Sequence, residues 1–187
     1  MTDELQTYIA NAVRFEGCVP YMYQDVRGYV TVGVGHLVRN PDDAILLPFT
    51  QSGERATDNQ IANDYARVKR LPPGMSHEHY ASHDPLTLSV TCINDLLESH
   101  LAKTCLPGCR HLFPGFDTYP TPAKECLVDV DYSLGNGGLG TFVQLRRACA
   151  ERRFYDASNQ VHVSTSRDVR NQWRRDCMIA AAKEIEG

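Results

Sequence analysis

The sequence of 187 residues lacks a long apolar run and lacks an excess of positive charge. A helix needs about 20 mostly apolar residues in a row to cross a bilayer, and because no such run occurs we expect no membrane span. The net charge is -4 and the pI is about 5.9, which argues against nonspecific binding to nucleic acid or to an anionic surface. These absences favour a globular protein that does not bind nucleic acid.

The cysteines lack the spacing of a disulfide framework or a metal site. The sequence contains seven, an odd number, and none forms a CxxC pair. Buried thiols made in a reducing cytoplasm are the simplest interpretation of such a set. Cys105 and Cys109 flank Leu-Pro-Gly and would bridge only if the protein meets an oxidising compartment.

The first residues lack the pattern of a signal peptide. Residues 1–11 have the character of an acidic amphipathic helix, without a basic segment followed by an apolar one. We therefore expect a protein made in the cytoplasm without an export signal. The length is that of one domain, residues 1–187, which could be divided into two lobes and can bury a real core.

The most informative stretch runs from Glu16 to His36 and reads EGCVPYMYQDVRGYVTVGVGH. Before it, apolar residues recur at helical spacing between Asp3 and Phe15, which predicts an amphipathic helix. Glu16 follows on the apolar face, and Gly17 suits the left-handed conformation that ends a helix. We expect Glu16 to be partly buried, and partial burial would raise its pKa, as a general acid requires.

After Pro20 the pattern predicts a hairpin. Residues 29–35 alternate valines with other residues, as in a half-buried strand, and residues 21–24 would form the partner strand. The turn is Val26-Arg27-Gly28, which places Asp25 at the rim of the hairpin. Thr31 faces away from the valines. The sequence therefore predicts that two carboxylates, Glu16 and Asp25, and the Thr31 hydroxyl face one cleft.

These residues resemble the phage-type lysozymes, or endolysins, of glycoside hydrolase family 24. The family signature is a helix-terminal Glu-Gly, then Tyr-x-Asp, then Gly-x-x-Thr-x-Gly-x-Gly-His. The corresponding residues here begin at Glu16, Tyr23 and Gly28 and end at His36, with the family's spacing throughout. The resemblance is tight over residues 5–36, loose over residues 124–178, and weak between them.

The resemblance implies that Glu16 is the general acid, Asp25 the second carboxylate and Thr31 the residue that helps to position the attacking water. The residue types suit the same roles, because glycoside hydrolysis needs a protonated acid and an ionised carboxylate on either side of the bond. A hydroxyl that both donates and accepts suits a nucleophilic water, which favours inversion of configuration. Taken singly, Glu16 would be a helix-end charge and Asp25 a turn former; their joint spacing with Thr31 favours catalysis.

Several further residues are candidates for substrate binding or for structure. Tyr23 and His36 belong to the motif, although His36 could simply tie the hairpin to the rest of the fold or pair with Asp95. In the second half, residues 132–140 resemble the family's aromatic-polar-x-Gly segment and supply further candidates, namely Tyr132, Ser133, Phe142 and Gln144. Tyr132 and Phe142 are equally consistent with core aromatics. Leu145 stands where the family often has Ser or Thr.

The rest of the chain is predicted mainly from helical periodicity. Residues 37–54 are predicted to be irregular, and a capping box at residues 57–60 begins a helix that ends near Arg70. The 71–85 segment contains His77, His79 and His83, which could bind a metal, but a solvated loop is the expectation. Helices are predicted at residues 86–104, which would join the lobes, and at 122–134 and 166–186, with residues 105–121 as a connection. On the last helix a stripe from Val169 to Ala181 is expected to be buried, and its arginines to form either an exposed basic face or internal ion pairs.

The sequence thus predicts an α+β, mainly helical, two-lobed lysozyme-like fold around a cleft. The β-hairpin lobe would span residues 17–87, and the helical lobe residues 88–187 with the helix at 2–16. The expected function is that of a muramidase, a glycoside hydrolase that cuts the β-1,4 bond between N-acetylmuramic acid and N-acetylglucosamine in bacterial peptidoglycan, without metal or cofactor. We expect a monomer whose partner is the glycan strand, delivered to the periplasm by a phage holin or a secretion system. The alternatives are an antibacterial effector with an immunity or inhibitor protein, and an inactive peptidoglycan-binding relative.

Overall fold

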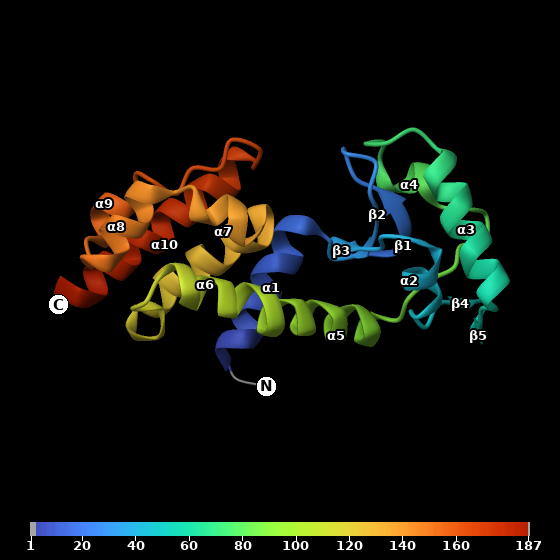
Figure 1. The fold of residues 1–187 in the computed structure, drawn as a ribbon, viewed down its shortest axis with the longest axis horizontal. Helices are drawn as coiled ribbons and strands as arrows, with labels where there is room; N and C mark the ends of the chain where they lie inside the picture. The colour runs from blue at the N-terminus through green and yellow to red at the C-terminus, as the bar shows by residue number, and fades with distance from the viewer. Residues whose placement is uncertain (1–2, 187) are drawn as a thin grey trace. The chain divides into compact units, whose positions relative to one another are not determined.

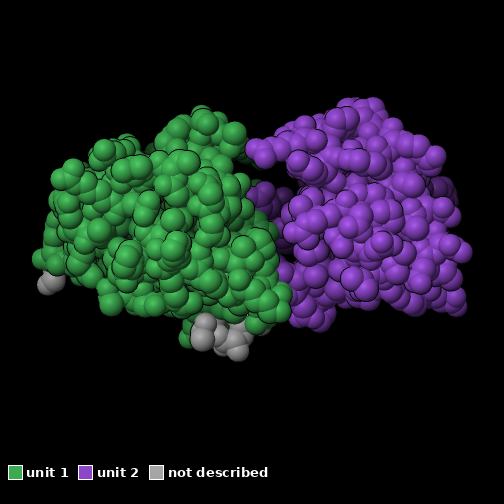
Figure 2. All heavy atoms as spheres, viewed as in Figure 1, with its two compact units in different colours: residues 1–15, 98–187 green, residues 16–97 purple. Residues whose placement is uncertain are grey.

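The computed structural model describes residues 3–186, and the chain divides into two compact units (Figure 2). The hairpin unit consists of residues 16–97, and the helical unit consists of residues 1–15 and 98–187. The α+β, mainly helical fold class expected from the sequence is confirmed. None of the helices described between residues 3 and 186 has the length and apolar character needed to cross a membrane.

The hairpin unit is built on a three-stranded antiparallel sheet. Its strands are β1 (Val19–Gln24), β2 (Val30–Gly33) and β3 (His36–Leu37), in the order β1-β2-β3 (Figure 1). The predicted turn joins β1 to β2, and Gly28 in this turn has a φ of 78°, which glycine adopts without steric cost. Tyr23 and Thr31 are direct cross-strand partners, so their side chains lie on the same face of the sheet.

Strand β2 is covered on both faces, unlike the half-buried strand that the sequence predicts. The valines at 30, 32 and 34 are buried as expected, but Thr31 and Gly33 on the opposite face are buried too. Gly33 lies against Ile93 of α5 (Val90–His100). A Cβ added to Gly33 would lie only 2.9 Å from Ile93 Cγ2. The absence of a side chain at residue 33 therefore allows α5 to pack against the sheet.

Gly33→Ala should destabilise the protein by about 2 kcal/mol or more, since it combines a left-handed backbone with overpacking. The φ of Gly33 is 68°. Gly53→Ala is the matched control, because Gly53 has a φ of 87° but nothing within 4 Å of an added Cβ. Urea unfolding of both variants measures the difference. An equal loss in the two would mean that the contact with Ile93 contributes nothing.

Residues 37–54 were predicted to be irregular, and this prediction was wrong. They contain the end of β3 and three further elements, α2 (Pro41–Ile45), β4 (Thr50–Gln51) and the start of β5 (Glu54–Arg55). Asn40 caps α2 by accepting a hydrogen bond from the Asp43 backbone N–H at 2.9 Å, and Pro41 occupies the first turn. The Asn-Pro pair, a turn signal by composition, is here a helix start.

The next helix, α3 (Asp58–Arg70), confirms the predicted capping box, which forms between Thr57 and Gln60. The 71–85 segment that follows is a mostly exposed loop, as expected, but it also contains α4 (His77–Tyr80) and a fully buried tyrosine. The Tyr80 hydroxyl donates to the Pro72 carbonyl oxygen at 2.6 Å and accepts from the Met75 N–H at 3.2 Å. Within residues 3–186 no group of three or more His, Cys, Asp or Glu side chains is suited to hold a metal ion.

The helical unit contains the rest of the helices. The chain enters it as α1 (Asp3–Glu16), which confirms the predicted first helix, and returns within α5. The later elements are the π-helical turn η1 (Leu101–Cys105), α6 (Leu106–Leu112), the 3-10 turn η2 (Phe116–Thr118), α7 (Thr121–Gly140), α8 (Val143–Ala150), α9 (Phe154–Ala157) and α10 (Asp168–Glu186).

The sequence prediction for residues 86–121 was partly wrong. Helix α5 begins at Val90 rather than Leu86, and helical structure continues to Leu112 through residues predicted to be a connection. Pro107 does not end this helical run. It lies in α6 just after the π-helical turn η1, and a π-helical turn is one of the irregularities found where the i→i−4 hydrogen bonds of a helix are interrupted. Gly108 makes room for Asn136 of α7, whose side chain occupies the position of an added Cβ.

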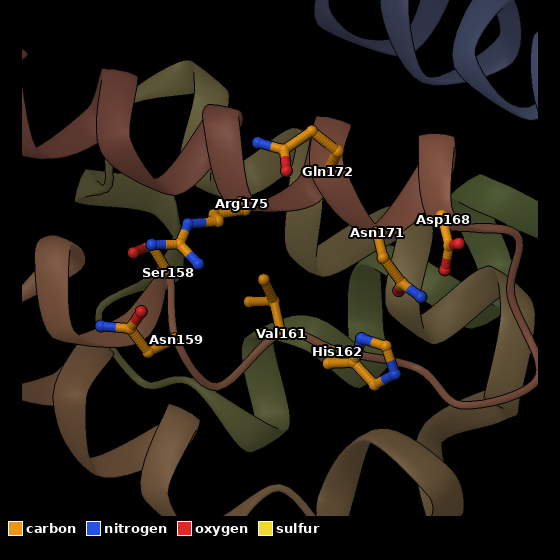
Figure 3. Close-up of a pocket in the computed structure, with 8 residues that line it drawn as sticks. All are labelled: Ser158, Asn159, Val161, His162, Asp168, Asn171, Gln172 and Arg175. Atoms are coloured by element: carbon orange, nitrogen blue, oxygen red, sulfur yellow. The ribbon is translucent and has the colours of Figure 1, made fainter.

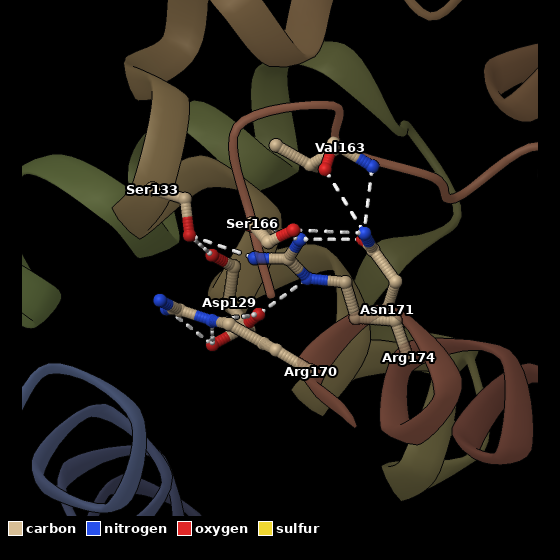
Figure 4. Close-up of polar contacts among 7 residues, drawn as sticks. All are labelled: Asp129, Ser133, Val163, Ser166, Arg170, Asn171 and Arg174. Carbon is tan, nitrogen blue, oxygen red and sulfur yellow. Dashed lines mark hydrogen bonds and ion pairs between the residues drawn. The ribbon is translucent and has the colours of Figure 1, made fainter. Parts of the chain in front are cut away.

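The buried face of α10 carries arginines as well as part of the predicted apolar stripe, of which Cys177 and Ala181 are buried. Val169 is 62% exposed, whereas Arg170 is 7% exposed and Arg174 is fully buried. Both arginines form ion pairs with Asp129 of α7, at 2.8 and 2.6 Å (Figure 4). Of the two alternatives that the sequence left open, internal ion pairs are therefore present, while Arg175 is exposed.

Hydrogen bonds complete this network. Arg174 donates to the hydroxyl oxygens of Ser133 at 2.7 Å and Ser166 at 2.9 Å, and Ser133 donates to the Asp129 carbonyl oxygen at 2.9 Å. Buried charged groups are costly unless they are paired and hydrogen-bonded, which explains why so many partners surround one guanidinium. The network joins α7 to α10 and the loop before it.

Asp131, also on α7, is buried beside a thiol. It is 1% exposed, and its Oδ1 atom has no hydrogen-bond partner among the residues described. Burial raises the pKa of Asp131 to about 6, although a hydrogen bond with the Cys105 side chain acts in the opposite direction. Its other oxygen, Oδ2, accepts a long hydrogen bond from Asn136 at 3.4 Å, so burial still makes the ionised form less favourable than it is in water.

Asp131→Asn should make stability less dependent on pH. The pKa is about 3.8 for an unperturbed Asp and about 6 for Asp131 in the folded chain. The contribution of Asp131 to the stability of the fold is therefore fully present below pH 3.8 and is lost as the pH rises through 6. Two pKa units correspond to about 3 kcal/mol. The variant should therefore gain stability over the wild type between pH 4 and pH 7, measured by thermal unfolding at both. A pH-independent difference would contradict this assignment.

All seven cysteines are free thiols, as the sequence predicts. Five of them are buried, namely Cys105, Cys109, Cys126, Cys149 and Cys177, while Cys18 is exposed. Burial raises the pKa of the five buried thiols, which keeps them protonated and unreactive. Cys105 and Cys109 are not bridged.

Candidate functional site

Tyr23 of β1 brings together the three residues that the sequence predicts to be catalytic. Burial raises the pKa of Tyr23, and the negative charges of Glu16 and Asp25 raise it further, whereas a side-chain hydrogen bond with Thr31 lowers it. The charges of Glu16 and Asp25 thus act on the Tyr23 phenol, and Thr31 is the direct cross-strand partner of Tyr23. All four residues belong to the hairpin unit.

Asp25 is held in place by the turn that it forms. Its Oδ1 atom accepts hydrogen bonds from the backbone N–H groups of Arg27 at 2.9 Å and Tyr29 at 2.8 Å. Its carbonyl oxygen accepts from the N–H groups of Gly28 and Gly74, at 3.0 and 3.1 Å. Within residues 3–186 no donor reaches the other carboxylate oxygen, Oδ2. Asp25 is thus a turn former whose carboxylate is fixed in direction and keeps one oxygen available.

Glu16 ends α1, as predicted, and Gly17 follows in the left-handed conformation with a φ of 77°. The side chain of Glu16 is exposed, so the expectation of partial burial was wrong. Glu16 is the last residue of α1, and the chain changes direction at Gly17 directly after it. Its side chain therefore does not share the burial of the apolar face of the helix.

Thr31 is 6% exposed and its hydroxyl lies 3.4 Å from the Tyr23 carbonyl oxygen. A hydrogen bond of this length is weak, so the hydroxyl is not fully committed to the backbone. His36 lies in β3 opposite Val32 and is partly exposed. Its place in the sheet suits the structural role that the sequence allowed for it.

The four candidates of the helical unit do not form one group. Tyr132 contacts His100, with ring centroids 5.5 Å apart, while Ser133 belongs to the arginine network and binds Arg174. Phe142 is partly buried just before α8, and Gln144 is exposed on α8. Substrate binding by Ser133 is disfavoured, because its hydroxyl already donates to one partner and accepts from another.

The helical unit has a separate polar pocket that the sequence did not predict. Its volume is about 350 Å³, and it lies between the loop after α9 and the first turns of α10 (Figure 3). Buried Val161 and Asn171 form its base, whereas His162, Asp168 and Arg175 are exposed around it. None of the residues predicted to be functional lines this pocket.

Sequence reasoning missed the position of His77. Its ring lies against that of Tyr23, with centroids 4.6 Å apart and planes at 56°. The sequence contained a cluster of histidines in the 71–85 segment, but nothing in that pattern indicates an aromatic partner 54 residues earlier in the chain.

The part of the chain that the structure describes has a lysozyme-like fold. Among 224 matching chains of solved structures is a mutant of P22 lysozyme, which is 16% identical in sequence to this chain. The TM-score is 0.55, and the alignment covers 94% of each chain. No protein-family model and no curated protein matches the sequence. The likeness establishes the fold.

Proposed function

We propose that this protein is a muramidase of the phage-type lysozyme kind, similar to glycoside hydrolase family 24, that cuts the β-1,4 glycosidic bond of peptidoglycan. The observation that carries the proposal is that Glu16 at the end of α1, Asp25 in the β1–β2 turn and Thr31 on β2 belong to one unit. The spacing of the same residues in the sequence and the lysozyme-like fold support it. The same chemistry would serve an endolysin or an antibacterial effector.

In the proposed mechanism, Glu16 donates a proton to the leaving glycosidic oxygen. Glu16 is exposed in the free protein, so the environment that favours proton donation must be completed by the bound glycan, which excludes water from the carboxyl. Protonation of the leaving oxygen by a positioned acid typically accelerates such a reaction by about 10²–10⁴-fold.

Asp25 and Thr31 would act on the opposite side of the sugar ring. The open Oδ2 of Asp25 can accept a proton from a water molecule, and the Thr31 hydroxyl can hold that water, because it both donates and accepts hydrogen bonds. Attack by water on the face opposite the leaving group inverts the configuration at the anomeric carbon. The proton lost by water goes to Asp25, and the proton given by Glu16 leaves with the released sugar.

Mass spectrometry of digested bacterial sacculi tests this proposal. A muramidase releases fragments with N-acetylmuramic acid at the reducing end, which borohydride reduction converts to muramitol. Reducing N-acetylglucosamine would indicate a glucosaminidase, and a 1,6-anhydro product would indicate a lytic transglycosylase. Intact sacculi that nevertheless retain the protein in a sedimentation assay would replace the proposal by the inactive peptidoglycan-binding alternative.

A further inference from the structure

His77, the first residue of α4, contacts the central residue of the proposed site. Its ring centroid lies 4.6 Å from that of Tyr23, within the range at which aromatic rings attract one another. Both residues belong to the hairpin unit, and both side chains are partly buried. The 71–85 segment thus places a second aromatic ring directly behind the phenol that adjoins Glu16, Asp25 and Thr31.

The segment that carries His77 is fixed on both sides of it. Before His77, the Gly74 N–H donates to the Asp25 carbonyl oxygen at 3.1 Å. After it, the fully buried Tyr80 binds back to the Pro72 carbonyl oxygen. The backbone before and after His77 is thus held by hydrogen bonds, which restricts where the His77 ring can lie.

Tyr23 passes this support on to Thr31. The Tyr23 and Thr31 side chains are direct cross-strand neighbours on one face of the sheet. The hydrogen bond from the Thr31 hydroxyl to the Tyr23 carbonyl oxygen, at 3.4 Å, is too long to fix the hydroxyl by itself. The space open to the Thr31 side chain therefore depends on where the Tyr23 ring lies.

The geometry points to His77 as a positioning residue: by packing against Tyr23, it keeps the Tyr23 ring beside Thr31, and so keeps the Thr31 hydroxyl directed toward the attacking water. This inference rests on the proposed function, since it assigns His77 to that same site. His77 does not touch the reacting atoms. It contributes by restricting the motion of the Tyr23 ring.

Kinetics of His77→Ala on soluble peptidoglycan fragments test the inference. Loss of one aromatic contact should lower kcat by about two- to tenfold, while KM stays within about twofold because no substrate contact is removed. His77→Phe should restore most of kcat, since it keeps a flat ring against Tyr23. The control is His79→Ala on the same helical turn, because His79 contacts Tyr80 instead, with ring centroids 5.6 Å apart; it should leave kcat unchanged.

A double-mutant cycle separates this role from general destabilisation. In a Tyr23→Ala background, which lacks the ring that His77 packs against, adding His77→Ala should cause no further loss of kcat. A full additional loss, an unchanged kcat in His77→Ala, or no recovery in His77→Phe would each overturn the inference.

One readout does not depend on activity. Nuclear Overhauser contacts between the Tyr23 ring and the Thr31 methyl group should be present in the wild type and weakened in His77→Ala. If the wild type does not cleave peptidoglycan, the proposed function fails, and these contacts still decide whether His77 positions Tyr23. Unchanged contacts in His77→Ala would reject the positioning role whatever the activity.

Discussion

Glu16→Gln should lower the rate of peptidoglycan hydrolysis by about 10²–10⁴-fold, the contribution expected of a general acid. Glutamine has nearly the same shape as glutamate but cannot donate the proton that the leaving oxygen requires. Glu16 is exposed, and surface substitutions usually change the free energy of unfolding by less than about 0.5 kcal/mol. The loss should therefore occur without a change in the thermal transition.

Release of soluble muropeptides from purified sacculi measures this effect. The matched control is Glu54→Gln, which removes an exposed carboxylate from β5 of the same unit and should leave the rate unchanged. If the glutamine variant at residue 16 retains most of the activity, Glu16 is not the acid, and the proposed mechanism is wrong even if the protein is a hydrolase. Equal losses in both variants would indicate an effect of charge on binding to the wall.

Asp129→Asn should destabilise the protein by about 3–5 kcal/mol, the usual effect of removing one partner from a buried ion pair. The Asp129 carboxylate accepts hydrogen bonds from Arg170 Nη2 at 2.8 Å and from Arg174 Nε at 2.6 Å. An asparagine would offer only one acceptor oxygen and would turn donor hydrogens toward guanidinium groups. Two buried cations would then lack their common counter-charge.

Urea unfolding followed by circular dichroism measures this loss. Asp176→Asn is the control, because Asp176 is an exposed residue of α10 that accepts a hydrogen bond from the exposed Gln172 on the same helix. Its loss should stay below about 0.5 kcal/mol. A comparable loss in the two variants would mean that the network of Figure 4 contributes no more than a surface contact.

The sequence predicted the helix and hairpin around the candidate site because their signals are local. Gly17 and Gly28 adopt the left-handed conformations that end a helix and make a turn. Asp25 forms the turn through N–H groups two and four residues away. Side-chain-to-backbone bonds of this kind depend on few neighbours, so composition and spacing are sufficient to predict them.

Predictions failed where the outcome depended on distant contacts. A Pro- and Gly-rich sequence does not show that Pro107 lies in the first turn of a helix, or that Gly108 accommodates Asn136. The 71–85 segment is polar enough to suggest a solvated loop, yet Tyr80 anchors it and His77 packs on Tyr23. The exposure of Glu16 also depends on what surrounds the end of α1.

The sequence alone determined the fold class, the first helix, the hairpin and the identity of the candidate residues Glu16, Asp25 and Thr31. Only the tertiary structure decided that Tyr23 joins these three, that His77 supports Tyr23, and that Ser133 is taken up by Arg174. The physical reason is the range of the interactions. Turns and helix ends form between residues a few positions apart, whereas a buried pair such as Asp129 and Arg174 joins residues 45 positions apart and depends on how the whole core packs.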